Sequence, residues 1–364
     1  MKYILISIFL FPLVFFGQPK NSSVYDSLMK NHEDFSGVIL IAENGEPVFQ
    51  KAFGFREFTK QIPLLTDDVF EMASVSKQFT AMIIMMLQEK GKLKYDDLVE
   101  NYINIPYKGI TIRQLLTHTS GLPDYQEIMD KHWDKTKVAG NPDIIKYLNQ
   151  YAPPVLFESG TSYKYSNTGY VLLASIAEEA SGKDFIKLSR KWIFKPLHMK
   201  STNIRTPRQK AATKNFTVGH LRDEVNQTYK RADADPSFDY TIWLGNRKGP
   251  GRVSSTAEDL LKWDQALRTE KLVKQSTLLA AYQPMKLVNG KQSYYGFGWM
   301  IDKDPEHGKT VRHTGDNPGY RTQIVRYLDA DKTIILLSNN AYPELDKMIN
   351  ELTSLLFNPA YSSN

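Results

Sequence analysis

The placement of the strand-like segments constrains this fold most, because they lie at the two ends of the chain. Residues 37–42 and 47–55 are rich in β-branched and aromatic residues and flank Asn44-Gly45, which predicts a hairpin with a tight turn. Four further strand-like runs cover residues 295–301, 310–314, 320–328 and 333–338. Sequential strands joined by short turns pair antiparallel, so the simplest assembly joins both chain ends in one sheet.

Helical patterns fill the region between these ends. In residues 74–90, apolar side chains recur at spacings of three and four, which predicts a helix with one buried face. Other helices are predicted over residues 25–30, 112–116, 141–149, 168–180, 257–267 and 344–357. The expected fold is therefore α+β, with an antiparallel sheet flanked by helices and a second, mostly helical lobe.

The expected boundaries place the sheet lobe at about residues 25–75 and 255–360 and the helical lobe at about 76–254. Residues 201–252 are polar, contain scattered Gly and Pro, and support no assignment. Such a stretch is typical of a functional loop region. We expect it to wall a substrate pocket between the lobes, where binding sites commonly lie.

The first residues predict export. A positive start at Lys2 precedes an almost wholly apolar run over 3–16, and Gly17 follows, which is typical of a signal peptide over 1–17. The alternative is an uncleaved anchor. No other run approaches the 18 apolar residues that a membrane span needs, so residues 18–364 are expected to lack an integral membrane segment. The expected location is the periplasm or the exterior.

Composition excludes several classes of function. Hydrophobic residues make up 41% of the 364, which argues against disorder. The net charge of +6 is modest and no long block of like charge exists, so no nucleic-acid partner is expected. A weak attraction to anionic envelope material is the alternative to an ordinary solvated surface. No Cys is present and the seven His show no metal-ligand spacing, so neither a metal nor another cofactor is expected.

Ser74 and Lys77 form a Ser-x-x-Lys motif at the start of the predicted helix. Residues three apart share a helix face, so hydroxyl and amine can touch. Serine needs a neighbouring base, and lysine can serve once burial lowers its pKa. The motif alone is weak, since Ser27 and Lys30 repeat it and Ser76 also neighbours the lysine.

Tyr165 and Asn167 form a second candidate pair. They follow a Gly-Thr-Ser loop over 160–162 and precede a predicted helix, where side chains can face a cleft. The same Tyr-x-Asn spacing occurs over 102–104 and 147–149. The alternative is structural, with Tyr165 as a buried aromatic and Asn167 as a helix N-cap.

His313 and Gly315 form a third candidate group at the end of a predicted strand. His313 has two possible functional roles, binding a substrate carboxylate or tuning a neighbouring base. Gly315 would let a substrate approach the backbone. The alternative is a hydrogen-bonded structural histidine.

Taken together, the order Ser-x-x-Lys, Tyr-x-Asn, His-x-Gly resembles serine β-lactamases and penicillin-binding proteins. Tyr165 in the second motif makes the chain more similar to class C β-lactamases, D-alanyl-D-alanine carboxypeptidases and their esterase relatives. The Leu-Leu-Thr-His-Thr-Ser-Gly-Leu stretch over 115–122 also resembles this family. Its position in this stretch favours a structural role for His118 over the alternative of a catalytic base.

The resemblance implies a role for each candidate. Ser74 would attack a carbonyl carbon, and Lys77 and Tyr165 would share proton transfer, with the identity of the base left open. Asn167 would hold Lys77 and a polar group of the substrate. The backbone N–H groups of Ser74 and Asp316 would form the oxyanion hole.

Two departures from the family pattern bear on the substrate. His313 stands where many relatives carry Lys, which weakens the positive charge that would hold a β-lactam carboxylate. Asp316 adds a negative charge beside the expected oxyanion hole, and an inward carboxylate would disfavour anionic substrates.

We therefore expect an exported serine hydrolase of the esterase or D-amino-acid peptidase type, acting on a small molecule or a peptidoglycan peptide. A class C-like β-lactamase and a non-catalytic penicillin-binding or scaffold protein are the alternatives. The sequence leaves the oligomeric state open.

Overall fold

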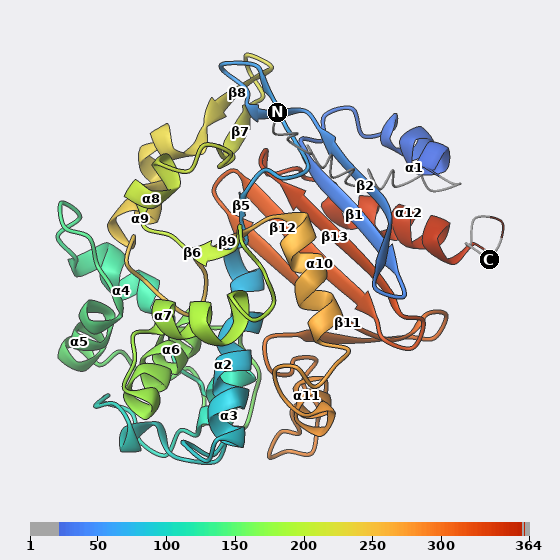
Figure 1. Cartoon of the computed structure of the whole chain (residues 1–364). Coiled ribbons are helices and arrows are strands. Elements are labelled where there is room, and N and C mark those ends of the chain that lie inside the picture. Colours follow the sequence, from blue (N-terminus) through green and yellow to red (C-terminus); the bar gives the residue numbers. More distant parts are fainter. Residues whose placement is uncertain (1–21, 359, 361–364) are drawn as a thin grey trace, which may run out of the picture.

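The computed structural model describes residues 22–358 and 360, so the predicted signal peptide over 1–17 lies outside the described residues. Both chain ends enter one antiparallel sheet with the order β10-β11-β12-β13-β1-β2 (Figure 1), as the sequence predicts. Its strands are β1 (Gly37–Glu43), β2 (Glu46–Phe53), β10 (Met300–Asp304), β11 (Gly308–Asn317), β12 (Tyr320–Tyr327) and β13 (Lys332–Ser338). The closing pair is β1 with β13, in the register Gly37↔Ser338 to Glu43↔Lys332.

Side-chain alternation along β1 fills both faces of the sheet. Ile39 and Ile41 pack on one face with helices α1 (Ser22–Met29) and α12 (Leu345–Phe357). Val38 and Leu40 point to the opposite face and join the main core. Because successive strand residues point to opposite faces, a strand buried on both sides reads as a continuous apolar run.

Helix α10 (Ala257–Ala266) covers the second face, beside α11 (Gln275–Ala281), and α1 and α12 lie behind the sheet (Figure 1). Asp264 of α10 ties this layer to the strands. Its carboxylate accepts hydrogen bonds from Arg326 of β12, from Thr333 of β13 and from Arg268. Burial alone would raise the pKa of Asp264, but the two guanidinium groups more than offset this and lower it.

The helical lobe packs around α2 and α6. Its elements are η1 (Ala73–Ser76), α2 (Lys77–Glu89), η2 (Val99–Asn101), α3 (Ile112–Leu116), α4 (Tyr125–His132), α5 (Asn141–Tyr151), α6 (Asn167–Ser181), α7 (Phe185–Ser189) and the π-helical turn η3 (Arg190–Phe194). A Thr111–Gln114 capping box starts α3, and Gly182 ends α6 at a positive φ of 64°, which glycine adopts without strain.

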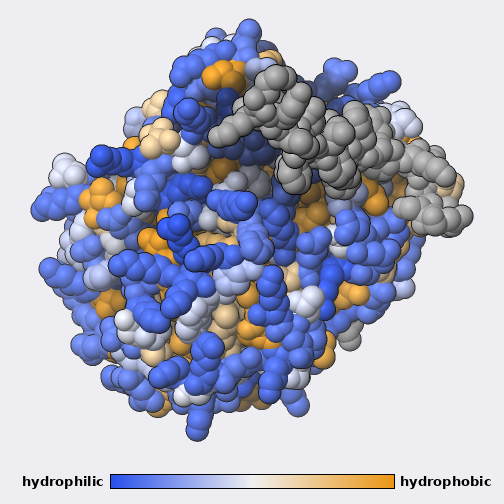
Figure 2. All heavy atoms as spheres, viewed as in Figure 1, coloured by the Kyte–Doolittle hydropathy of each residue, from blue (hydrophilic) through white to orange (hydrophobic). Residues whose placement is uncertain are grey.

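Short elements connect the lobes, and several fall in the stretch over 201–252 that the sequence left unassigned. They are β3 (Phe55–Glu57), β4 (Ile62–Pro63), β5 (Phe70–Glu71), β6 (Asn203–Ile204), α8 (Pro207–Ala211), β7 (His220–Asp223), β8 (Thr228–Arg231), η4 (Ala232–Ala234), η5 (Pro236–Phe238), α9 (Tyr240–Trp243) and β9 (Val253–Ser255). Hydrophilic side chains cover most of the visible surface, and hydrophobic ones are scattered in small groups (Figure 2).

Two predicted elements are wrong in detail. The strand predicted over 295–301 begins only at Met300, because Gly296 and Gly298 are packed tightly against the Ala281 carbonyl and the start of α2. The helix predicted over 74–90 is α-helical only from Lys77, because residues 73–76 form a tighter 3₁₀ turn after Ala73, whose φ is 44°.

Replacing Asp264 with Asn tests the link between α10 and the sheet. The substitution leaves the buried Arg326 guanidinium without its counter-charge, and removing one partner of a buried ion pair costs about 3–5 kcal/mol. We expect the free energy of unfolding in urea to fall by that amount. In the matched control Asp96→Asn, which breaks the exposed pair with Arg113, a loss of under about 1 kcal/mol is expected. Equal losses in both variants would contradict the assignment.

Candidate active site

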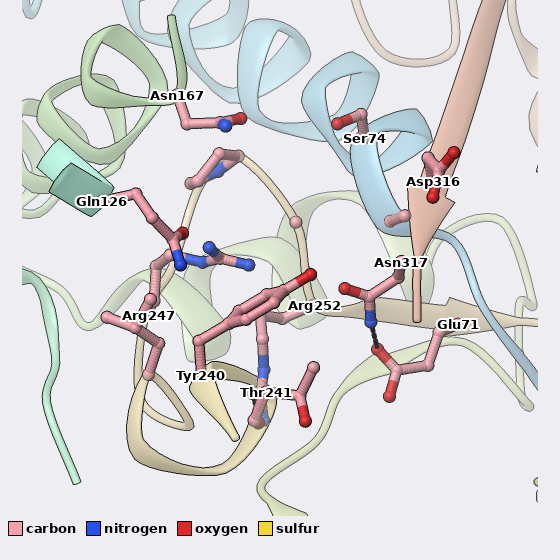
Figure 3. Close-up of a pocket in the computed structure, with 14 residues that line it drawn as sticks. Glu71, Ser74, Gln126, Asn167, Tyr240, Thr241, Arg247, Arg252, Asp316 and Asn317 are labelled. Carbon is pink, nitrogen blue, oxygen red and sulfur yellow. Dashed lines mark hydrogen bonds between the residues drawn. The ribbon is translucent and has the colours of Figure 1, made fainter. Parts of the chain in front are cut away.

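Ser74 lies on the 3₁₀ turn η1, between β5 and α2, and lines a cavity of about 270 Å³ (Figure 3). In a 3₁₀ helix the side chains at positions i and i+3 eclipse, so Ser74 and Lys77 align more closely than in an α-helix. Ala73 holds a positive φ of 44° immediately before the serine. Such strained backbone clusters at functional sites.

Lys77 is fully buried behind Ser74, and its amine contacts three oxygens from separate parts of the chain. The Nζ atom lies 3.0 Å from Ser74 Oγ, 2.9 Å from Asn167 Oδ1 and 2.9 Å from the Pro250 carbonyl. The structure therefore brings three of the predicted positions, Ser74, Lys77 and Asn167, into one hydrogen-bonded cluster.

These contacts suit a neutral amine. Burial lowers the pKa of Lys77 well below its usual value, Arg247 lowers it further, and Asp124 partly counteracts both. Asn167 Oδ1 and the Pro250 carbonyl can only accept, so they take the two N–H groups of a neutral amine. The lone pair then faces the Ser74 hydroxyl, which is the arrangement of a general base beside a nucleophile.

Tyr165 lies against the same amine, with its ring centroid 4.7 Å from Lys77 Nζ. Burial raises the pKa of Tyr165, and its hydrogen bond to Ser74 lowers it in part, so the phenol stays protonated. The His118 ring packs against that ring in a tilted arrangement, with the centroids 4.2 Å apart, and its Nδ1 accepts from the Ser166 backbone N–H at 3.2 Å. His118 thus positions the Tyr165 loop.

His313 is buried with both ring nitrogens engaged. Nδ1 lies 2.6 Å from the Thr314 carbonyl, which can only accept, so this nitrogen carries the proton and Nε2 accepts from the Tyr295 hydroxyl at 2.7 Å. Burial and then Lys77 lower the pKa of His313 to about 3. A neutral, enclosed imidazole does not offer a cation to a substrate carboxylate, so the geometry favours the tuning or structural role.

Gly315 is required by packing. A Cβ there would lie 2.3 Å from the Met72 carbonyl oxygen and 3.1 Å from Ala73 Cβ. Close approach of η1 therefore gives Gly315 a packing role beside the predicted approach of a substrate. This contact places Ser74 and Asp316, which follow Ala73 and Gly315, next to the same cavity.

Asp316 stands at the rim of the cavity. Its side chain is 75% exposed, and its carboxylate lies 3.5 Å from Arg321 Nε. The inward orientation that would disfavour anionic substrates is not adopted.

The rival motif matches do not join this hydrogen-bonded cluster. Ser27 belongs to α1 on the far face of the sheet, and Ser76 Oγ accepts from the Val253 backbone N–H at 3.1 Å. The hydroxyl of Tyr102 donates to Asp97, and that of Tyr147 to the His132 carbonyl.

Sequence reasoning missed several residues that line the cavity. These are Glu71, Gln126, Tyr240, Thr241, Leu244, Arg247, Arg252 and Asn317. Five of them come from the unassigned stretch over 201–252, whose expected place in a pocket wall agrees with the structure. The paired arginines around Gly249-Pro250-Gly251 are the sequence signal that could have identified part of this set.

Comparison with known proteins agrees with this geometry, because the family described as Beta-lactamase matches residues 23–356. The chain belongs to the β-lactamase family. Penicillin-binding protein 4* of Bacillus subtilis is 41% identical over 87% of this chain and 70% of its own length. The family match also agrees with the α+β architecture predicted from the sequence.

Solved structures share the fold. The penicillin-binding protein of Bacillus halodurans has a TM-score of 0.79 at 24% identity, covering 91% of this chain and 98% of its own. The D-amino acid amidase of Ochrobactrum anthropi SV3, solved with L-phenylalanine amide, has a TM-score of 0.72 at 22% identity, covering 92% and 96%.

Within residues 22–358 and 360, no cluster of three or more His, Cys, Asp or Glu side chains could hold a metal ion. Among the same residues, no helix is long and apolar enough to cross a membrane.

Replacing Asp124 with Ala tests how the site is positioned. Its carboxylate accepts from the backbone N–H of Gln126 and of Asn167, each at 3.0 Å, so it caps α4 and fixes the start of α6. We expect the free energy of unfolding to fall by about 1–2 kcal/mol.

The same substitution tests the electrostatics of the site. Asp124 raises the pKa of Lys77, so its loss should move the pH dependence of Ser74 labelling by a fluorophosphonate to lower pH.

Asp184→Ala is the matched control, since Asp184 caps α7 away from the cavity by accepting from the Lys187 backbone N–H at 3.0 Å. It should destabilise similarly and leave the labelling profile in place. A profile that shifts equally in both variants would refute the electrostatic link between Asp124 and Lys77.

Proposed function

We propose that this protein is an exported serine hydrolase that cleaves an ester or amide through a Ser74 acyl-enzyme, of the esterase or D-amino-acid peptidase type. The three contacts of the Lys77 amine carry the proposal. Two carbonyl oxygens take its N–H groups, so a neutral amine aims its lone pair at Ser74. A structural lysine has no need of a buried, neutral amine beside an accessible hydroxyl.

Acylation follows from this arrangement. Lys77 takes the proton of the Ser74 hydroxyl while the oxygen attacks the carbonyl carbon of the substrate. The tetrahedral intermediate collapses as the C–O or C–N bond breaks, and the leaving group receives a proton through Tyr165 and Lys77. The raised pKa keeps the Tyr165 phenol protonated, so it has a proton to pass to the leaving oxygen or nitrogen.

The negatively charged oxygen of the tetrahedral intermediate needs hydrogen-bond donors to stabilise it. The packing of Gly315 on Ala73 supports the family's arrangement, in which the backbone N–H groups of Ser74 and Asp316 face one carbonyl oxygen. Water then attacks the ester carbonyl, with its proton accepted by the Tyr165–Lys77 pair, which releases the acid and regenerates Ser74.

The substrate class is supported by the relatives and by His313. Relatives include a penicillin-binding protein and a D-amino acid amidase. His313, neutral and enclosed, replaces the lysine that many β-lactamases direct at the β-lactam carboxylate. This favours a small ester, amide or D-peptide over efficient β-lactam hydrolysis. Export to the periplasm or medium is proposed from the pattern of residues 1–17.

Intact-protein mass spectrometry tests the nucleophile. The mature chain is incubated with benzylpenicillin and, separately, with p-nitrophenyl acetate, beside a Ser74→Ala variant. We expect a Ser74-dependent adduct or turnover. A lasting penicilloyl adduct indicates a peptidase or esterase, and rapid penicillin hydrolysis indicates a β-lactamase. Identical behaviour of the Ala variant, or no reaction with either compound, would favour a binding or scaffold role.

Replacing Lys77 with Met tests the base. General-base catalysis contributes about 10²- to 10⁴-fold, and we expect the acylation rate to fall by that amount. In the wild type, protonation of the Lys77 amine removes the lone pair that accepts the Ser74 proton. The kcat/KM should therefore rise with pH through the lowered pKa of Lys77 and flatten above it.

Tyr165→Phe is the companion variant, because it removes only the hydroxyl. It should slow release of a poor leaving group more than release of p-nitrophenolate, and it should retain the rising limb of the pH profile. If the rising limb of the pH profile is lost in Tyr165→Phe but retained in Lys77→Met, the base is Tyr165.

A further inference from the structure

Arg247 places a cation inside the cavity that holds Ser74. Figure 3 shows its side chain and Tyr240 facing Ser74 and Asn167 across the cavity. One Nη atom donates to the Tyr125 hydroxyl. The Nε atom is buried and has no hydrogen-bond partner among the described residues. A buried N–H without an acceptor is costly, so Arg247 keeps an unused donor that suits an acceptor on a bound ligand.

The carboxylates around the cavity are already paired. Glu71 binds Lys210 and accepts from Asn317 at 3.0 Å, as the dashed line in Figure 3 shows. Asp316 lies at the rim beside Arg321, and both oxygens of Asp124 accept from backbone N–H groups. Within the part of the chain that the structure describes, Arg247 therefore forms no ion pair.

Arg252, also in the cavity wall, adds a second cation. Its guanidinium donates to the carbonyl groups of Arg205 at 2.9 Å and Thr241 at 3.4 Å, which supply no counter-charge. Its φ is 81°, a backbone conformation that costs a non-glycine residue about 1–3 kcal/mol. The fold thus keeps an arginine where glycine would be relaxed. Among the described residues, the two cavity carboxylates, Glu71 and Asp316, are paired with Lys210 and Arg321, while the guanidinium groups of Arg247 and Arg252 form no ion pair.

We propose that this cavity binds a carboxylate of the substrate, held by the guanidinium of Arg247, while the scissile carbonyl lies at Ser74. The inference rests on the proposed function and names its substrate class as esters or amides that carry a carboxylate. A guanidinium offers parallel N–H donors that match a carboxylate, and its free Nε completes that pair. The rival role for Arg247 is electrostatic only, as a cation that lowers the pKa of Lys77.

Two ester substrates that differ by a single methyl group separate these roles. The test compares kcat/KM for p-nitrophenyl hydrogen glutarate, which carries a carboxylate, with that for its methyl ester, which does not. The wild type should prefer the acid, and Arg247→Gln should lower this preference about 10- to 100-fold, as expected for a lost charged hydrogen bond. A merely electrostatic role would slow both substrates equally and leave their ratio unchanged.

Arg208→Gln is the matched control, because it removes the same charge from an exposed position of α8 outside the cavity lining. It should keep the wild-type ratio.

A second pair of substrates places the carboxyl group in the leaving group instead. These are the acetyl ester of 3-hydroxybenzoic acid, which carries a carboxylate, and the acetyl ester of methyl 3-hydroxybenzoate, which does not. The pair whose ratio responds to Arg247→Gln identifies which arm of the substrate enters the cavity, and a ratio unchanged in both pairs overturns the proposal.

Binding to the Ser74→Ala protein keeps this test separate from catalysis. Calorimetry should show tighter binding of p-nitrophenyl hydrogen glutarate than of the methyl ester, and Arg247→Gln should abolish the difference. If the wild type turns over neither ester, the proposed function fails, yet this binding difference still supports the carboxylate site. Equal binding of acid and methyl ester, in a protein that hydrolyses both, refutes the carboxylate site alone.

Discussion

The buried amine of Lys77 is the contact on which the site depends. It joins the 3₁₀ turn that carries Ser74, the start of α6 at Asn167 and the Pro250 carbonyl in the loop before β9. A charged amine in this position would be costly, and burial together with Arg247 lowers its pKa. The same desolvation that costs stability therefore favours the neutral amine that the proposed mechanism needs as its base.

The sheet sets the position of this turn. Pairing of β1 with β13 brings the two chain ends together, and β11 then runs past η1 so closely that only glycine fits at position 315. Ser74 from the first quarter of the chain and Asp316 from the last thereby line one cavity. Long-range strand pairing, rather than local helix structure, thus sets where Ser74 lies relative to the cavity wall.

The charges of the cavity are distributed differently from the family pattern. A cation would be expected at His313, yet that imidazole is neutral and enclosed by Tyr295 and the Thr314 carbonyl. The positive charge lies instead at Arg247 and Arg252, on loops around Gly249 and Gly251. A cation at Arg247, and not at position 313, changes which part of a substrate can carry a negative charge. The positions of Ser74 and Lys77 are not affected.

The sequence by itself determined the α+β class, the hairpin at Asn44-Gly45 and the pairing of Ser74 with Lys77, because these follow from local periodicity and short spacing. It did not determine the 3₁₀ turn, the late start of β10, the enclosure of His313 or the cavity wall formed by Arg247 and Arg252. Each of these depends on residues far apart in the chain that pack together, such as Gly298 on α2 and Gly315 on Met72. Burial and charge balance arise only from that packing, so the tertiary structure alone decided which cations face Ser74.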